Sequence, residues 1–526
     1  FSGNIVLPTH LRTNTKNIYK DYLRDGINNM SFNSIDYLIF FPIVVLMYFI
    51  LPKRIRMSWL LIISYYFYMS WNVKYGLLIL FSTAVTYLCG LGLEHVKRNS
   101  EEKKQKILKV TVIFLSLACN LGLLFYFKYT NFIINNINAV YQKLGITVQY
   151  PNFDIVLPVG ISFFIFQTIG YTIDIYRDDI QAEKNPFRYA LFVSFFPQLV
   201  AGPIERSKNL LTQLRDSHGF HVDNAKNGLL TMAYGLFTKI VVADNIAAVI
   251  DPIFNSPDAH TGMMLLFATI LFAFQIYCDF NGYTQIAIGS AMVLGFKLNP
   301  NFDAPYMGSS VKDFWGRWHI SLTSWFRDYL YIPLGGSRKG KIRKQLNTII
   351  VFLCSGLWHG AAWHYVVWGG LNGVFSVFED IFKPVENKII KKFSVNTEMF
   401  MYKLLRRLIT FVLIDFTWLF FRAPDLSTAL LILEKIKNDF RLAWLINFDF
   451  VGLFSSSYVL MTTLIPLLII IVVDTLKYYG KDIKAAIFGQ QIVFRWIIYI
   501  GIMLSILYWG FYGTGYEQTQ FIYFQF

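Results

Sequence analysis

Charged residues are scarce in this chain of 526 residues. Asp, Glu, Lys and Arg make up 15% of it, whereas an ordinary soluble domain contains about 25%. Hydrophobic residues make up 55%. The length would suffice for roughly three soluble domains, but there are too few charges to cover their surfaces. The composition therefore excludes a soluble multidomain enzyme, a disordered protein and a fibrous repeat. It predicts a polytopic membrane protein.

Cysteine and the common catalytic motifs are also missing or rare. The four cysteines, Cys89, Cys119, Cys278 and Cys354, lie in apolar surroundings without C-x-x-C spacing. This pattern indicates neither a disulfide framework nor a zinc site. The chain has no G-x-S-x-G, H-E-x-x-H or G-x-G-x-x-G motif. We expect no bound metal or cofactor.

One partial motif is a phosphate loop. Residues 335–341 fit its opening, but Ile342 stands where Ser or Thr is required and no strand precedes the motif. We reject a nucleotide-hydrolysing loop. The basic segment 334–344 is then either a cytoplasmic loop only or a contact for the phosphates of an anionic donor.

Long apolar runs recur along the chain, and a helix needs about 20 such residues to cross a bilayer. The candidate spans are residues 35–51, 57–71, 75–93, 108–127, 155–173, 187–201, 226–250, 262–295, 346–374, 401–421, 457–474 and 491–511. Those with Pro158 and Pro197 are candidates for re-entrant segments. We expect an all-α bundle with roughly ten to twelve crossings, forming a single domain over residues 30–526.

The net charge of +15 fits the enrichment of Lys and Arg in cytoplasmic loops, because the basic residues fall between the apolar runs. No nucleic-acid partner is expected. The basic segments at 53–56, 97–109, 388–392, 403–407 and 477–484 are predicted to be cytoplasmic. The last of them places the C-terminus outside. Residues 1–29 have no signal-peptide core. They are either an exposed tail or a non-native extension ahead of a start at Met30.

Polar residues within a membrane protein are costly and are therefore candidates for function. They concentrate between residues 275 and 372. Residues 311–331, rich in tryptophan and charge, are predicted to form one interfacial helix in which Trp315, His319 and Thr323 share a side. His319 is then either functional or an interfacial anchor. The other polar or aromatic candidates of this region are Asp279, Asn281, Arg317, Trp318, Arg327 and Asp328.

A second histidine, His359, lies in the apolar run 353–370 beside Trp358 and the small residues that follow it. Small residues allow a helix or ligand to approach the backbone. If the run is one helix, His364 lies about 140° away, so the two histidines cannot share a metal. His359 is either functional or a buried histidine bonded to a backbone carbonyl.

Six ordered blocks of sequence resemble the membrane-bound O-acyltransferase family, most of all the branch of the alginate O-acetylation membrane protein. The blocks are LPVGISFFIFQTIGYTIDIYR (157–177), FFPQLVAGPIER (195–206), YCDFNGYTQIAIGSAMVLGF (277–296), FWGRWHISLTSWFRDYLYIPLGGSR (314–338), GLWHGAAWHYVVWGG (356–370) and FTWLFFRA (416–423). The terminal FIYFQF also looks like that branch. The resemblance covers essentially all of residues 30–526.

The resemblance implies a helical membrane bundle with a cytoplasmic funnel. It implies that His359, in the W-H-G block, is the catalytic residue and that His319 is the second functional residue. Acyl transfer needs a base for the attacking group and a donor to the developing oxyanion. His359 suits the first role, and His319, Arg317 or a backbone N–H suits the second. Trp318, Trp358, Arg327, Asp328, Asp279 and Asn281 are the candidate substrate-binding residues.

The activity implied is O-acetyl transfer from a cytoplasmic donor, acetyl-CoA, to a polysaccharide outside the bacterial cell membrane. Alginate, cellulose, another exopolysaccharide and peptidoglycan all stay open as acceptors. The implied partners are a separate extracytoplasmic acetyltransferase, a glycan synthase complex and membrane lipid. The alternatives are a D-alanyl transfer protein of the teichoic acid type and a transporter of an acyl donor or glycan without chemistry.

Overall fold

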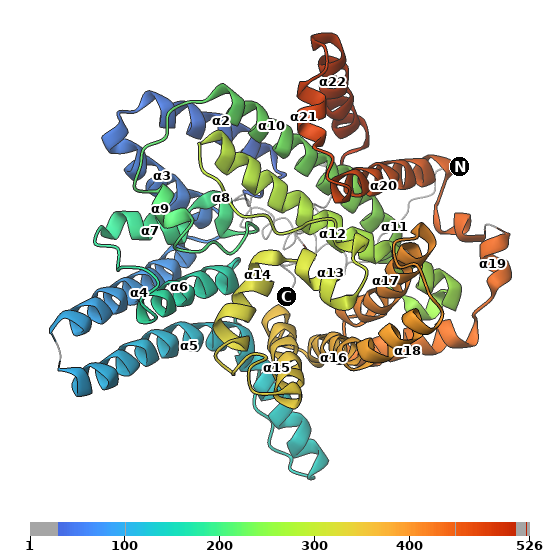
Figure 1. Ribbon diagram of the computed structural model, residues 1–526, viewed down its shortest axis with the longest axis horizontal. Coiled ribbons are helices and arrows are strands. Elements are labelled where there is room, and N and C mark those ends of the chain that lie inside the picture. The colour runs from blue at the N-terminus through green and yellow to red at the C-terminus, as the bar shows by residue number, and fades with distance from the viewer. Residues whose placement is uncertain (1–29, 100, 448, 512–521, 523–526) are drawn as a thin grey trace, which may run out of the picture.

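The computed structural model describes residues 30–99, 101–447, 449–511 and 522, and every regular element within these residues is helical (Figure 1). The predicted all-α fold is confirmed. The proposed extension, residues 1–29, lies outside the described residues. The first elements are α2 (Ile35–Ile50), α3 (Lys53–Met69), α4 (Val73–Asn99), α5 (Glu102–Lys143), α6 (Ile161–Tyr176), α7 (Pro186–Ser194), α8 (Phe196–Leu199) and α9 (Leu210–Gln213).

The central elements carry most of the polar candidates and the later ones most of the C-terminal apolar runs. The central set is α10 (Val222–Leu236), the π-helix η1 (Phe237–Ala243), α11 (Asp244–Asn255), η2 (Pro257–Ala259), α12 (Gly262–Val293), η3 (Pro305–Met307), α13 (Val311–Arg317), α14 (Ile320–Phe326), the π-helix η4 (Arg327–Tyr331), α15 (Lys341–His359), α16 (Trp363–Lys392) and α17 (Phe400–Arg422). The chain continues through α18 (Leu426–Asn438), α19 (Leu442–Ile446), η5 (Asp449–Leu453), α20 (Ser457–Tyr478), α21 (Ile483–Phe488) and α22 (Ile492–Trp509).

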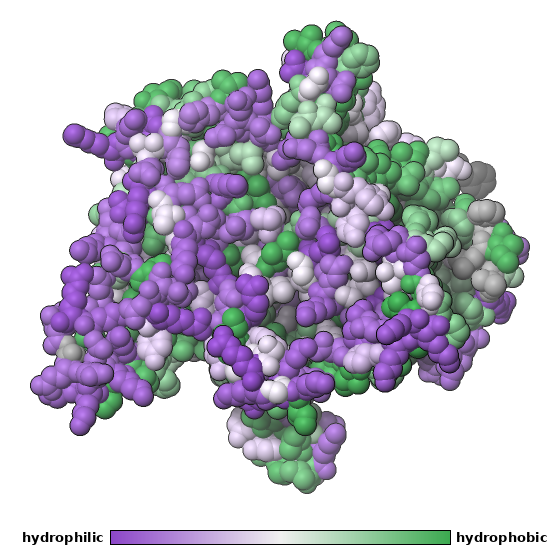
Figure 2. All heavy atoms as spheres, in the orientation of Figure 1, coloured by the Kyte–Doolittle hydropathy of each residue, from purple (hydrophilic) through white to green (hydrophobic). Residues whose placement is uncertain are grey.

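Six helical segments of the described chain are long and apolar enough to cross a membrane: Val73–Asn99, Glu102–Lys143, Val222–Asn255, Gly262–Val293, Ser457–Tyr478 and Ile492–Trp509. The shorter α2 is also apolar. These segments make the chain a multi-pass membrane protein, while the number of ten to twelve crossings stays a prediction. Figure 2 shows hydrophilic residues over much of the face toward the viewer and hydrophobic residues along the right-hand edge.

The long helix α12 is buried along most of its length and forms the centre of the bundle. Its N-terminus is capped by the Thr261 hydroxyl, which accepts a hydrogen bond from the Met264 N–H. It packs closely on α10 because glycines meet at the contact. A methyl group on Gly235 would lie 2.7 Å from the Gly282 carbonyl oxygen, so only glycine permits this approach.

Two segments that were each predicted to form one helix, residues 311–331 and 346–374, are interrupted in the structure. Residues 311–331 form α13 and α14 with a turn between them, because the His319 backbone is left-handed, with φ +45°. The Ile320 N–H then donates to the Asn301 carbonyl, at 2.9 Å, instead of continuing the helix. The prediction that Trp315, His319 and Thr323 share one helical side is therefore wrong.

The second break falls in the predicted span 346–374. Helix α15 ends at His359, Gly360 and Ala362 have extended backbone, and α16 begins at Trp363. His359 and His364 therefore lie on different helices, and the angle of about 140° predicted between them does not apply. The predicted breaks near Pro158 and Pro197 are present, since α6 starts only at Ile161 and residues 187–201 form the short α7 and α8.

Candidate active site

His319 lies at the turn between α13 and α14, where it is 1% exposed. Its ring is 4.7 Å from that of Phe280, 6.0 Å from Trp358 and 6.4 Å from Phe163, measured between centroids. The following turn is held in place because Ser321 donates to the Asn301 side-chain oxygen at 2.6 Å. The tight turn thus presents one imidazole to an aromatic enclosure deep in the bundle.

His359 is the last residue of α15 and is 3% exposed. Its ring contacts those of Trp358, Trp368 and Phe421 with centroid distances of 4.8, 4.9 and 5.4 Å. Because Trp358 touches both imidazoles, the structure brings the two histidines of the resemblance into one site although 40 residues separate them in the sequence.

Two glycines position α15 against α16. A methyl group on Gly356 would lie 2.3 Å from the Tyr365 carbonyl oxygen, and one on Gly369 would lie 2.3 Å from the Phe352 carbonyl oxygen. Atoms cannot approach so closely, so the two backbones meet only because neither residue has a side chain. This contact fixes the end of α15 and with it the place of His359.

The C-terminal carbonyls of α15 are bonded by two side chains of α5. Tyr129 donates to the Leu357 carbonyl at 2.8 Å. The Lys128 ammonium donates to the carbonyls of Trp358 at 2.5 Å and His359 at 3.0 Å. The last carbonyls of a helix have no partner within it, and a cation there also complements the helix dipole. Lys128 and Tyr129 therefore hold the helix end that carries His359.

Sequence reasoning missed Lys128, although its place in an apolar stretch is a signal that was available. Together with Trp358, His359 and residues 157–163, Lys128 lines a cavity of about 40 Å³. The residues that precede and begin α6 form one wall of this cavity. His359 thus has a small space beside it.

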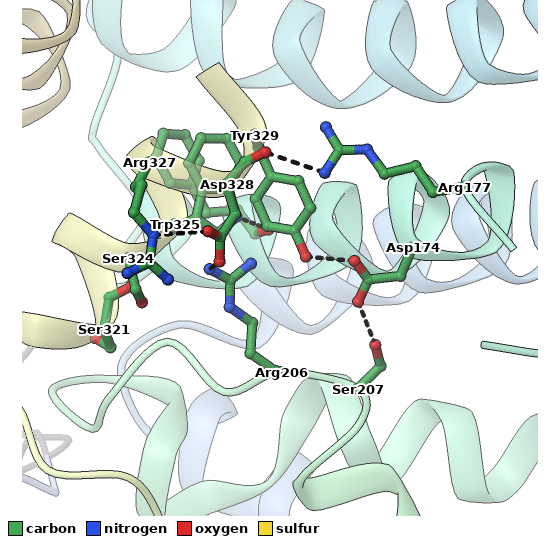
Figure 3. A network of polar contacts seen from close by, with 11 residues as sticks. Asp174, Arg177, Arg206, Ser207, Ser321, Ser324, Trp325, Arg327, Asp328 and Tyr329 are labelled. Atoms are coloured by element: carbon green, nitrogen blue, oxygen red, sulfur yellow. Dashed lines mark hydrogen bonds and ion pairs between the residues drawn. The ribbon is translucent and has the colours of Figure 1, made fainter. Parts of the chain in front are cut away.

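Arg327 and Asp328 lie apart from the histidine pair, in the polar network of Figure 3. Asp328 pairs with Arg327 at 2.9 Å and with Arg206 at 3.0 Å, and its carbonyl accepts a hydrogen bond from Arg177 at 3.0 Å. The neighbouring Tyr329 hydroxyl donates to Asp174 of α6 at 2.6 Å. The network joins η4 to α6 and to the segment after α8, and it gathers three guanidinium groups.

Arg317 and Trp318 have different surroundings, although they adjoin His319. The Arg317 guanidinium is bonded to Asp313 at 2.8 Å and to Asp303 at 3.3 Å. Trp318 is 1% exposed and its ring lies 4.9 Å from that of Trp418. Both side chains thus brace the turn that carries His319.

Asp279 belongs to a buried ionic cluster that was not predicted from the sequence. Lys239, within the π-helix η1, pairs with Asp279 at 2.5 Å and with Asp244 at 2.8 Å. The other oxygen of Asp279 accepts a hydrogen bond from the Ile522 N–H at 2.8 Å. The cluster ties α12 to η1 and to a residue near the C-terminus, which favours a positioning role over direct contact with substrate.

Asn281 and His364 complete the candidates. Asn281 accepts a hydrogen bond from Gln285 at 3.1 Å and lines a separate, larger cavity. A ring nitrogen of His364 lies 3.0 Å from the Phe420 carbonyl oxygen. That contact is the one expected of a structural histidine.

The sequence model of the membrane-bound O-acyltransferase family matches residues 60–421. The chain belongs to this family. It is an acyltransferase, and the resemblance of its six blocks is thereby confirmed. The matched range contains His319, His359 and Lys128 and ends at the close of α17.

Individual relatives extend the match. The chain is 36% identical to the probable alginate O-acetylase AlgI of Pseudomonas syringae, over 74% of this chain and 71% of that protein. It is 34% identical to the peptidoglycan O-acetyltransferase of Helicobacter pylori, over 75% and 77% of the two chains. Similarity to the teichoic acid D-alanyltransferase of Streptococcus thermophilus is lower, at 28% over 44% of this chain and 60% of that protein.

Proposed function

We propose that this acyltransferase takes acetyl groups from a cytoplasmic donor and passes them to the outer side of the cell membrane for O-acetylation of a polysaccharide. The observation that carries the proposal is the pairing of two buried imidazoles, His319 and His359, across Trp358. The names of the relatives, alginate O-acetylase and peptidoglycan O-acetyltransferase, support acetyl as the group transferred.

The position of His359 relative to the membrane supports transfer to an outer acceptor. Helix α5 starts beside a basic loop that is predicted to be cytoplasmic. The path from Lys109, the last basic residue of that loop, to Lys128 is about 28.5 Å at 1.5 Å per residue, close to the thickness of a hydrocarbon core of about 30 Å. Helix α15 also starts in a basic loop, at Lys341, and ends at His359. Both helices support a position of the cavity beside His359 away from the cytoplasmic loops.

The chemistry follows from this placement. The acceptor hydroxyl gives its proton to the neutral His359 imidazole while its oxygen attacks the acetyl carbonyl. The new carbon–oxygen bond forms, the carbon–sulfur bond of a thioester donor breaks, and the thiol leaves with a proton. His319 supports the oxyanion. Because Arg317 is already bonded to two carboxylates, it is a weaker candidate for that role than His319.

Acetyl-CoA is the proposed donor, and its phosphates require cations on the cytoplasmic side. Arg177, Arg206 and Arg327 gather around Asp328 (Figure 3). A guanidinium group binds phosphate in a bidentate manner. These three residues are the best placed for the donor, together with the basic loop before α15. The final acceptor is alginate or a related surface polysaccharide, or peptidoglycan. The acetyl group reaches it through a separate extracytoplasmic acetyltransferase, which works with a glycan synthase complex.

The test supplies acetyl-labelled acetyl-CoA to inside-out membrane vesicles of cells that carry the native chain, His359→Ala or His260→Ala at equal abundance. We expect ester-linked label in the glycan fraction with the native chain. The same is expected with His260→Ala, because this residue lies in the loop before α12. His359→Ala should reduce labelling by about 10²–10⁴-fold.

Each other outcome contradicts the proposal. Normal labelling with abundant His359→Ala protein would remove the catalytic role of His359 and favour transport without chemistry. Recovery of D-alanyl esters in place of acetyl esters on the cell-surface polymer would favour the D-alanyl transfer alternative.

A further inference from the structure

A large apolar cavity lies outside the histidine site, between the C-terminal helices and the centre of the bundle. Its volume is about 810 Å³, and α10, α12, α20, α21 and α22 provide its walls. Helix α22 has no buried residue, and Figure 1 shows α21 and α22 projecting from the bundle near α20. The family match ends at residue 421, so one wall of the cavity comes from helices beyond the matched range.

The lining of this cavity is unsuited to water. Most lining residues are hydrophobic, among them Phe237, Ile469, Ile498 and Ile502. Ordered water needs two to four polar partners, and the aliphatic and aromatic parts of these walls offer none. In a membrane, hydrocarbon chains are the material available to fill a space of this kind.

One rim of the cavity is cationic. Lys477, Lys481 and Lys484 line it where α20 connects to α21. Two carboxylates, Asp474 and Asp482, line the cavity near these lysines, and Asp482 also caps α21 by accepting from the Ala485 N–H. The three lysines outnumber the two carboxylates. The rim therefore presents ammonium groups beside an apolar interior.

The lysines retain hydrogen-bonding capacity. Each ammonium group has three donors. Lys484 uses one on the Thr231 hydroxyl, at 2.7 Å, and Lys477 contacts the Phe302 carbonyl at 3.1 Å and Asp303 at 3.3 Å. The Lys481 side chain makes no hydrogen bond or ion pair with the part of the chain that the structure describes. Lys481 and Lys484 can thus both donate to an anion.

We propose that this cavity is a binding site for an anionic phospholipid of the cytoplasmic leaflet. The acyl chains lie against α12, α20 and α22, and the phosphate lies between Lys477, Lys481 and Lys484. The charge distribution favours a lipid over a membrane helix of a partner protein. The helix would offer an apolar surface along its length, whereas here the charge sits at one rim, at the depth of a headgroup.

The experiment reconstitutes the full chain in vesicles of equal parts dioleoylphosphatidylglycerol and dioleoylphosphatidylcholine. The protein is then extracted in mild detergent, and the retained lipids are measured by mass spectrometry. The native chain should retain phosphatidylglycerol in preference. The double variant Lys481→Gln/Lys484→Gln should lower that preference by about five-fold for each lysine. Lys103→Gln/Lys104→Gln, two lysines at the exposed start of α5, is the matched control and should not change it.

A second variant tests the apolar part of the site. Gly501 lines the cavity on α22, and a side chain there would meet no atom within 4 Å. Gly501→Phe should therefore occupy the cavity and reduce retention of both lipids. Gly122→Phe, on α5, also faces open space but lines no part of this cavity, and it should retain lipid normally.

Three results would overturn the proposal. The first is equal retention of the two lipids by the native chain. The second is unchanged retention in both the double lysine variant and Gly501→Phe. The third is a co-purified polypeptide, lost in Gly501→Phe, in place of the phospholipid, which would show that a partner helix occupies the cavity.

Discussion

Around His359 the helices leave a cavity of about 40 Å³, whereas α20 and α22 help to enclose about 810 Å³. The first region is packed with tryptophan and phenylalanine, and glycines let α15 and α16 touch. One wall of the second region is α22, a helix without buried residues. A reacting group needs positions fixed within a fraction of an ångström, while a site for flexible hydrocarbon chains does not. The contrast separates the helices that support chemistry from those that offer a surface to lipid.

The largest expected effect on activity beyond His359 is at His319. His319→Ala should lower acetyl transfer by about 10²–10³-fold, because a donor to the oxyanion is lost. His364→Ala is the control, since that ring contacts a carbonyl on α17, and it should be milder. Labelling from acetyl-CoA in vesicles, normalised to protein abundance, measures both. Equal losses in the two variants would contradict a special role for His319.

The largest expected effect on stability is at Asp279. Asp279→Asn removes one of the two carboxylates that pair with the buried Lys239 and should destabilise the protein by about 3 kcal/mol. Asp178→Asn is the control, because Asp178, which pairs with Lys97, is itself exposed. Thermal unfolding in detergent measures the difference. Unchanged stability with a raised KM for the donor or acceptor would instead restore the hypothesis that Asp279 binds substrate.

A methyl group added at the contact of α15 and α16 tests whether tight packing holds His359. Gly356→Ala places an atom 2.3 Å from the Tyr365 carbonyl oxygen and should cost about 1–3 kcal/mol of stability together with activity. Gly370→Ala is matched, because its new atom would lie at an ordinary 3.5 Å from Leu353. The idea of a packing constraint fails if both variants behave alike.

Lys128 offers a finer test of the same region. Lys128→Met removes the donor to the carbonyls of Trp358 and His359, and the cost of leaving buried acceptors unpaired is about 1–3 kcal/mol. We expect a lower kcat, with partial recovery in Lys128→Arg. Tyr129→Phe frees only the Leu357 carbonyl and should cost less. A fall in abundance without any change in kcat per folded molecule would limit Lys128 to a structural role.

The smallest expected effect is that of a substitution on the exposed side of α22, away from the cavity. Tyr508 is 77% exposed, so Tyr508→Ala should leave both the melting temperature and the acetylation rate unchanged. A loss of activity comparable to that of Gly356→Ala would show that α22 takes part in the reaction, and the contrast between the two regions would not hold.

Sequence reasoning found much of this molecule, because composition and apolar runs report directly on the membrane. The runs at 75–93, 108–127 and 457–474 each fall within a long apolar helix. The two candidate histidines, His319 and His359, came from the ordered blocks of the resemblance. Lys239 was overlooked because it lies inside a run that reads as apolar, and Lys128 because it directly follows one. The carbonyls that Lys128 bonds and the Asp279 carboxylate that pairs with Lys239 are far away in the sequence.

The sequence by itself determined the membrane class, the family and the two histidines, since hydropathy and ordered motifs are local properties of the chain. Only the tertiary structure decided that residues 311–331 turn at His319 and that the span 346–374 ends one helix at His359. Those breaks depend on hydrogen-bond partners from distant segments. The Asn301 carbonyl accepts from the Ile320 N–H, and two side chains of α5 donate to the last carbonyls of α15. Backbone groups buried in a membrane must be hydrogen-bonded, and no local sequence pattern predicts which residues supply their partners.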